Sequence, residues 1–126
     1  MIRDLKRLLA EASPELHPRP VAVIALDGFA APPGIELIGQ FREAEGLTLY
    51  VDLAAAEAAG LPIALRAAWI TMTVPSALDA VGFTAAFSAA LAQAGIACNV
   101  VAGARHDHLL VPWERAGEAM RALRGL

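Results

Sequence analysis

Apolar and polar positions alternate most clearly between Trp69 and Leu123, where short apolar runs are separated by glycine or proline. A β-branched apolar run predicts a buried strand, and apolar residues three and four apart predict a helix. The predicted order is strand 69–74, helix from about Asp79 to Ala94, strand 96–102, strand 106–111 and a helix opened by Pro112. This second half therefore predicts strand-helix-strand-strand-helix.

The first half has the same kinds of element in a weaker pattern. Helical spacing predicts an amphipathic helix over the first dozen residues. The further predicted elements are a strand over 21–26, a hairpin of 35–41 with 47–51, and a helix over 53–59 with Asp52 as its cap. Leu61–Arg66 gives the best boundary, so we expect two halves, residues 1–65 and 66–126.

Composition indicates a folded chain and argues against several classes of protein. Hydrophobic residues make up 57% of the 126 residues and charged residues 18%, which favours one domain or two small ones. A net charge of -3 gives no support for nucleic acid binding. No apolar run reaches the ~18 residues of a membrane span, and no signal peptide is evident. The single Cys98 fits a reducing compartment, so a cytoplasmic location is expected.

A candidate ligand site lies where the predicted strand 69–74 passes into the helix. Free backbone N–H groups at a helix start attract anions such as the carboxylate of an amino acid. Gly82 lacks a Cβ and would let a ligand approach closely. Asp79, the Asn99 side chain or nearby carbonyl groups would accept the ligand's ammonium group. The alternative is that Gly82 only relieves packing and that Asp79 or Ser76 only caps the helix.

His106-Asp107-His108 is the second candidate. On a strand, His106 and His108 would point to one face and Asp107 to the other. Two imidazoles at this spacing can face a ligand, sense pH or share a metal ion, but further metal ligands are not evident. A polar interface strand explains the same residues. Cys98 is expected in a buried strand as a small apolar side chain.

The run 81–96 resembles the "glycine, then helix, then Leu-Ala-x-Ala-Gly-Ile" signature of aspartokinase-type regulatory domains of the ACT family. Residues 98–103, 106–112 and 41–49 are similar to small stand-alone bacterial proteins with paired ACT-like halves, which distantly resemble the animal cytosolic arginine sensor. The resemblance implies an α+β fold, a ferredoxin-like sandwich with helices packed on one face of antiparallel sheets. It also implies that residues 1–65 are a degenerate ACT-like half, because a proline-rich loop replaces their glycine-then-helix step.

The resemblance further implies a ligand held at the strand-to-helix loop and at a domain or subunit interface. The expected ligand-binding residues are Ser76, Asp79, Val81, Gly82, Phe83, Asn99 and Val100. The resemblance allows Asn99 and Val100 to come from a neighbouring subunit. We expect a non-catalytic regulatory module that binds an amino acid, forms a homodimer and needs no cofactor. The alternatives are a metal-assisted enzyme built on His106 and His108, and a structural interaction module without a ligand. Replacing Gly82 by valine is expected to abolish binding and to leave the fold largely intact.

Overall fold

The computed structural model describes all 126 residues and divides into two compact units. The large unit comprises Met1–His17 and Ala68–Leu126, and the small unit comprises Pro18–Ala67. The first 17 residues therefore pack with the second half of the chain, a long-range contact that local patterns do not predict. The division into residues 1–65 and 66–126 follows chain order instead and stays a prediction.

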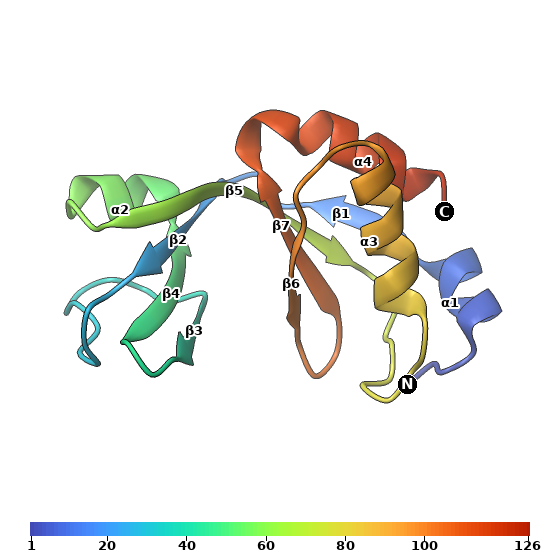
Figure 1. Cartoon of the computed structure of the whole chain (residues 1–126), viewed down its shortest axis with the longest axis horizontal. Coiled ribbons are helices and arrows are strands. Elements are labelled where there is room, and N and C mark those ends of the chain that lie inside the picture. The colour runs from blue at the N-terminus through green and yellow to red at the C-terminus, as the bar shows by residue number, and fades with distance from the viewer. The chain divides into compact units, whose positions relative to one another are not determined.

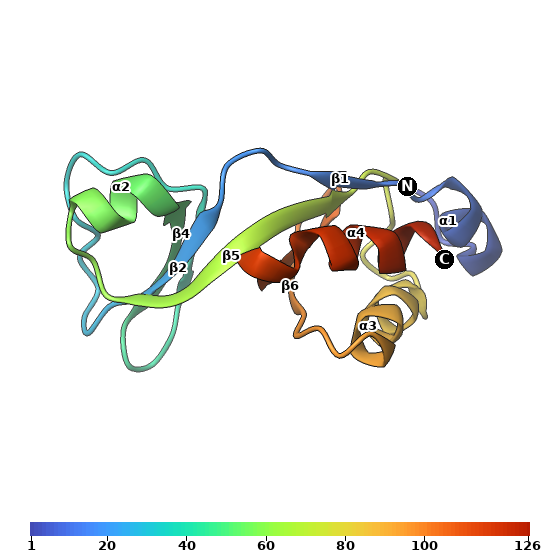
Figure 2. The ribbon, with the colours of Figure 1, turned by 90° about the horizontal axis from the view of Figure 1, so that it is seen from above.

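The large unit is a sheet with helices packed on one face. Its sheet has the strand order β1-β5-β7-β6, in which β5 also contributes its first residues to the small unit. The elements are α1 (Leu5–Glu11), β1 (Pro14–Leu16), β5 (Ile63–Met72), α3 (Phe83–Gln93), β6 (Asn99–Ala102), β7 (Asp107–Pro112), a 3-10 turn (Trp113–Arg115) and α4 (Ala116–Arg124). Figures 1 and 2 show α3 and α4 lying side by side.

The core of the large unit follows from the alternation of side chains along its strands. Ala68, Ile70 and Met72 of β5 are buried together with Leu109 and Val111 of β7. The helices supply the opposing apolar residues, which are Leu8, Phe83, Phe87, Leu91, Ala119, Met120 and Leu123. The alternate residues of the same strands lie on the other face, and these include Trp69, Thr71 and His108.

The helix predicted from Asp79 begins four residues later, at Phe83. Gly82 has a φ of 98°, a left-handed conformation that a helix cannot continue through, and Ala80 N–H donates to the carbonyl of Ala77 in a separate turn. Residues 77–82 therefore form a loop. The last helix is also shorter than predicted, because Trp113 starts a 3-10 turn and α4 begins at Ala116.

The small unit is an antiparallel sheet covered by one helix. Its strands have the order β3-β4-β2-β5, and its elements are β2 (Val21–Ala25), β3 (Gly39–Arg42), β4 (Leu47–Asp52) and α2 (Leu53–Ala58). Asp52 caps α2 as predicted, since its Oδ2 accepts from the N–H of Ala55 at 3.2 Å. The hairpin is confirmed, but its first strand begins at Gly39 instead of Ile35. No helix lies between β2 and β3, which agrees with the expected loss of the glycine-then-helix step.

Candidate ligand-binding site

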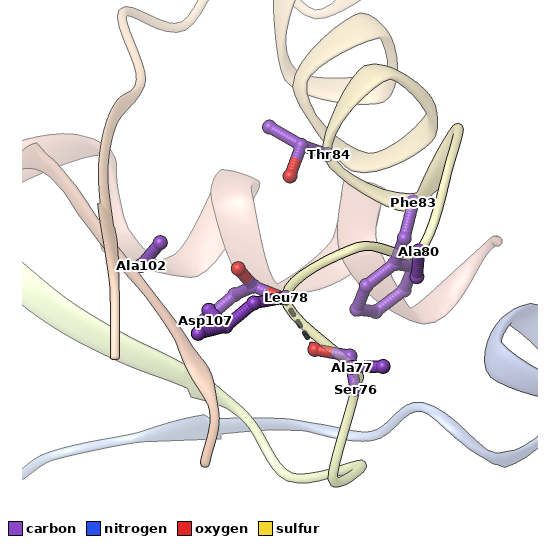
Figure 3. A pocket seen from close by; sticks show the side chains of 8 residues that line it. All are labelled: Ser76, Ala77, Leu78, Ala80, Phe83, Thr84, Ala102 and Asp107. Carbon is purple, nitrogen blue, oxygen red and sulfur yellow. Dashed lines mark hydrogen bonds between the residues drawn. The ribbon is translucent and has the colours of Figure 1, made fainter. Parts of the chain in front are cut away.

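A small pocket of about 80 Å³ opens in the large unit where α3 begins. It is lined by the loop after β5, the first turn of α3 and the adjoining ends of β6 and β7, as Figure 3 shows. The lining residues are Ser76, Ala77, Leu78, Ala80, Phe83, Thr84, Ala102 and Asp107. Ala102 and Asp107 are register partners at the closed end of the β6–β7 pair, so this pairing fixes one wall.

A buried carboxylate lies in this pocket. Asp107 is only 9% exposed, and it shares the core-facing side of β7 with Leu109 and Val111. Its Oδ2 accepts a hydrogen bond of 2.9 Å from the Ser76 hydroxyl, drawn as a dashed line in Figure 3. No ion pair of the chain includes Asp107. A buried carboxylate ordinarily has a charged partner, so Asp107 has capacity for a cation.

The start of α3 supplies the opposite electrostatic character. Its N-cap is Gly82, which makes no side-chain hydrogen bond, and its first turn contains no acidic residue. The N–H groups at a helix start carry a partial positive charge and favour an anion. Phe83 and Thr84 of this first turn line the same pocket as Asp107. The pocket therefore combines an anion-favouring wall with a carboxylate, and that pair of charges matches a small zwitterion.

The structure brings some of the predicted site residues together. Ser76 and Phe83 line the pocket, and Gly82 immediately precedes its first helical residue. Neither Ser76 nor Asp79 caps α3, so the capping alternative does not account for them. Asp79 does not line the pocket, because its side chain is 70% exposed and bonds the guanidinium of Arg3 at 2.8 Å.

The remaining predicted site residues lie outside the pocket. Val81 is 83% exposed on the loop, and Asn99 and Val100 lie toward the other end of β6 from Ala102. Gly82 also differs from expectation, because a Cβ there would lie 3.1 Å from Cδ2 of Leu5 in α1. The space beside Gly82 is thus filled by the core and gives no approach to a ligand.

This packing changes the test that the sequence suggested. Valine at residue 82 would be strained at a φ of 98° and would press on Leu5, so Gly82→Val is expected to destabilise the large unit. A loss of binding in this variant would then report unfolding as much as a blocked site. The structure therefore predicts that the fold of this variant does not stay largely intact.

Sequence reasoning missed Asp107 and the small residues around it. The sequence pattern places Asp107 on the strand face opposite the two histidines but gives it no role in binding. A usable signal was present, because residues 107, 109 and 111 share one face of a strand and the latter two are apolar. That alternation places Asp107 toward the core, where a carboxylate needs a partner.

The histidines form a separate cluster on the other face of the sheet. Strand β7 begins at Asp107, so His106 precedes it and does not share a strand face with His108. Trp69 Nε1–H donates to His108 Nδ1 at 3.1 Å, and Thr71 Oγ1 lies 3.0 Å from the same nitrogen. His17 Nε2 lies 2.7 Å from Thr71 Oγ1, and its ring stacks on Trp69 with 3.6 Å between ring centroids.

Burial lowers the pKa of both clustered histidines below the ordinary value of 6.5. For His17 the charge of Glu15 opposes this shift, and for His108 the charges of His106 and His17 reinforce it while Asp107 opposes it. The unfolded chain therefore binds more protons than the folded protein just below pH 6.5. The neutral rings contribute stability that is complete above the unfolded pKa and is lost as the pH falls toward the folded pKa.

We expect the free energy of unfolding to decrease between pH 7 and pH 5, which urea denaturation at fixed ionic strength would measure. Because the window lies above the ordinary pKa of carboxyl groups, the histidines dominate it. A double variant, His17→Gln with His108→Asn, should show a flatter dependence. Equal slopes in the two proteins would contradict this assignment.

No group of three or more His, Cys, Asp or Glu side chains is arranged to hold a metal ion. Cys98 is free and half-buried, and burial raises the pKa of its thiol. A raised pKa keeps the sulfur protonated and makes it a poor nucleophile.

No helix of the chain combines the length and apolar character needed to cross a membrane.

Solved structures include several that resemble this chain. A Vibrio cholerae protein of unknown function, described as a possible transport protein, is 42% identical, with a TM-score of 0.84 over 96% of this chain and 94% of the other. An Agrobacterium tumefaciens protein is 17% identical, with a TM-score of 0.74 over 90% and 87%. The ligand-free regulatory subunit of aspartate kinase from Thermus thermophilus is 17% identical, with a TM-score of 0.66 over 91% and 95%. No curated protein matches the chain.

Family models for the ACT domain match both parts of the sequence, one over residues 2–68 and another over residues 65–125. The first match covers more than half of the chain. The sheet, with the helices that cover it in each unit, agrees with the ferredoxin-like α+β fold that the sequence predicted. The chain therefore belongs to the ACT-domain family.

Proposed function

We propose that this chain is a non-catalytic regulatory module that binds a free amino acid at the pocket beside the start of α3. The observation that carries the proposal is the buried Asp107, which has one neutral hydrogen-bond donor and no cationic partner. The ligand's ammonium group would pair with Asp107. Its carboxylate would meet the uncapped N–H groups of the first turn of α3.

The size and lining of the pocket support a small ligand. Its volume of about 80 Å³ is far below the roughly 300–1,000 Å³ of sites for drug-sized molecules. The pocket would enclose the ammonium and carboxylate groups that all amino acids share. A ligand side chain would extend past Leu78, which is 72% exposed at the pocket. This arrangement favours a short or apolar side chain.

A homodimer is part of the proposal. Two apolar side chains of the loop, Leu78 and Val81, are more than two-thirds exposed beside the pocket. A second copy would cover these surfaces and close the mouth over the ligand. The free Cys98 thiol is consistent with a cytoplasmic location of the protein. Light scattering during size-exclusion chromatography, with and without ligand, would test the assembly.

Filling the pocket should abolish binding without touching the core. Ala102 lines the pocket and is exposed on β6, so Ala102→Leu is expected to remove the thermal stabilisation that an amino acid gives. A ligand at 100 times its Kd should add about 2.7 kcal/mol of stability to the unmodified protein. A thermal-shift screen of the dialysed protein against the common amino acids would supply the ligand for this comparison.

Val100→Leu is the matched control. Val100 lies two residues before Ala102 on the same strand and does not line the pocket, so it should keep the thermal shift. Equal shifts in both variants would place the ligand elsewhere. A flat screen for the unmodified protein would instead reject the amino acid as the ligand.

A further inference from the structure

The side chains His17, Trp69, Thr71 and His108 form a hydrogen-bonded group that the ligand site does not use. We call this group the histidine clasp. It lies on the face of the large unit's sheet opposite the core, and it joins the neighbouring strands β5 and β7. Trp69 and Thr71 belong to β5 and His108 to β7, while His17 follows β1 and its N–H donates to the carbonyl of Trp69 at 2.9 Å.

The indole N–H of Trp69 determines which ring nitrogen of His108 carries the proton. An indole N–H only donates, so His108 Nδ1 must be an unprotonated acceptor at 3.1 Å from Trp69 Nε1. A neutral imidazole then carries its proton on Nε2. Thr71 satisfies both of its neighbours if its hydroxyl donates to His108 Nδ1 and accepts from His17 Nε2–H.

The two histidines respond differently to acid. His17 can be protonated at Nδ1 and keep its Nε2–H on Thr71. A second proton on His108 must go to Nδ1, where an N–H would face the indole N–H of Trp69. Two donors facing each other repel, so the bond between Trp69 and His108 must break.

We propose that the histidine clasp is a proton-sensitive contact between β5 and β7 that is closed when His108 is neutral and opens when His108 is protonated. The charges that act on His108 are those of His106, His17 and Asp107, and Glu15 acts on His17. Asp107 acts from the opposite face of the sheet, where its side chain lines the pocket. On β6, the residue paired with His108 is the uncharged Val101.

Opening the clasp would affect the hydrogen bond between Ser76 and Asp107 in the pocket, because both sites depend on strands β5 and β7. Asp107 directly precedes His108 on β7, and Ser76 follows β5, which carries Trp69 and Thr71. The hydrogen bond between Ser76 and Asp107 therefore depends on the same pairing of β5 with β7. The relevance of this effect to ligand binding rests on the proposed function, whereas the clasp itself does not.

The test is an NMR titration of ¹⁵N-labelled protein from pH 7.5 to 5.0 without added ligand. In a Trp113→Phe background, Trp69 gives the single indole N–H signal. We expect that signal to shift in one transition centred below pH 6.5, with the backbone amides of Ser76 and Asp107 moving at the same midpoint. His108→Asn keeps an acceptor near the Nδ1 position and should remove the transition, whereas His106→Gln should retain it.

An unchanged indole signal, or the same transition in His108→Asn, would overturn the proposal. Movement of the indole signal without Ser76 and Asp107 would overturn the link to the pocket. If His108→Asn fails to fold, the tautomer of His108 in the parent protein tests the proposal instead. Long-range ¹H–¹⁵N spectra at pH 7.5 should show the proton of His108 on Nε2, and a proton on Nδ1 would refute the clasp. None of these results depends on whether an amino acid binds.

Discussion

Replacing Asp107 by asparagine is expected to weaken amino acid binding about 30-fold or more. Asparagine has nearly the same shape, and its Oδ1 can still accept from the Ser76 hydroxyl, so the large unit should fold normally. The variant loses the negative charge that would pair with the ligand's ammonium group. Removing one partner of a buried, hydrogen-bonded charge pair costs about 2 kcal/mol or more, which corresponds to that factor. Isothermal titration calorimetry with the amino acid found by thermal shift would measure it.

Asp79→Asn is the matched control for this experiment. It makes the same chemical change on the loop that leads into α3, at one of the residues that the sequence offered as an ammonium acceptor. The Asp79 side chain is exposed and bonded to Arg3, outside the pocket. Its variant should bind as the parent does. Weak binding by Asp79→Asn together with normal binding by Asp107→Asn would move the site to the loop surface.

Gly46→Ala is expected to give the largest loss of stability, about 3 kcal/mol, in the small unit. A Cβ at Gly46 would overlap the carbonyl oxygen of Leu26 and lie 2.7 Å from the N of Gly28. Both obstacles are backbone atoms that cannot rotate away, so the strands must separate. The bond of 2.9 Å from the N–H of Leu47 to the carbonyl of Gly28 would be strained or lost. Overpacking of this kind typically costs 1–3 kcal/mol, and a backbone clash belongs at the upper end.

Urea denaturation followed by far-UV circular dichroism would measure this loss, and tryptophan fluorescence would localise it. Both tryptophans, Trp69 and Trp113, belong to the large unit, so their signal should change less than the dichroism does. Gly60→Ala is the control. Gly60 also has a positive φ, of 65°, but a Cβ there meets open space, so only about 1 kcal/mol of backbone strain is expected. Equal losses in the two variants would contradict the steric explanation.

Local patterns predicted most elements of this fold because each depends on neighbouring residues. The strand at residues 21–25, the cap at Asp52 and the end of α3 near Ala94 follow from β-branching, side-chain acceptors and the backbone freedom of Gly95. The start of α3 was missed because Asp79 fits the helical spacing, whereas the conformation of Gly82 depends on packing against Leu5 of α1. Likewise, no strand is predicted at residues 14–16, since the pairing partner of β1 lies more than fifty residues away in β5.

The candidate site was predicted only in part for a related reason. The loop and helix start are local features, and Ser76 and Phe83 were found from them. Asp107 and Ala102 reach the same pocket through the pairing of β6 with β7 and of β7 with β5. The sequence pattern does not determine the register of these strand pairs. Asn99 and Val100 were chosen on the right strand but toward its other end. The pattern of a single strand, without its pairing register, therefore cannot show which of its residues line the pocket.

Binding of an amino acid at the start of α3 is tested most directly by a ¹H–¹⁵N NMR titration of the labelled protein with the amino acid that stabilises it most. Saturable shifts are expected at the amides of Phe83, Thr84 and Asp107, and none of that size in the small unit. Amide signals that stay unchanged at millimolar concentrations of every common amino acid, or shifts confined to the small unit, would contradict it.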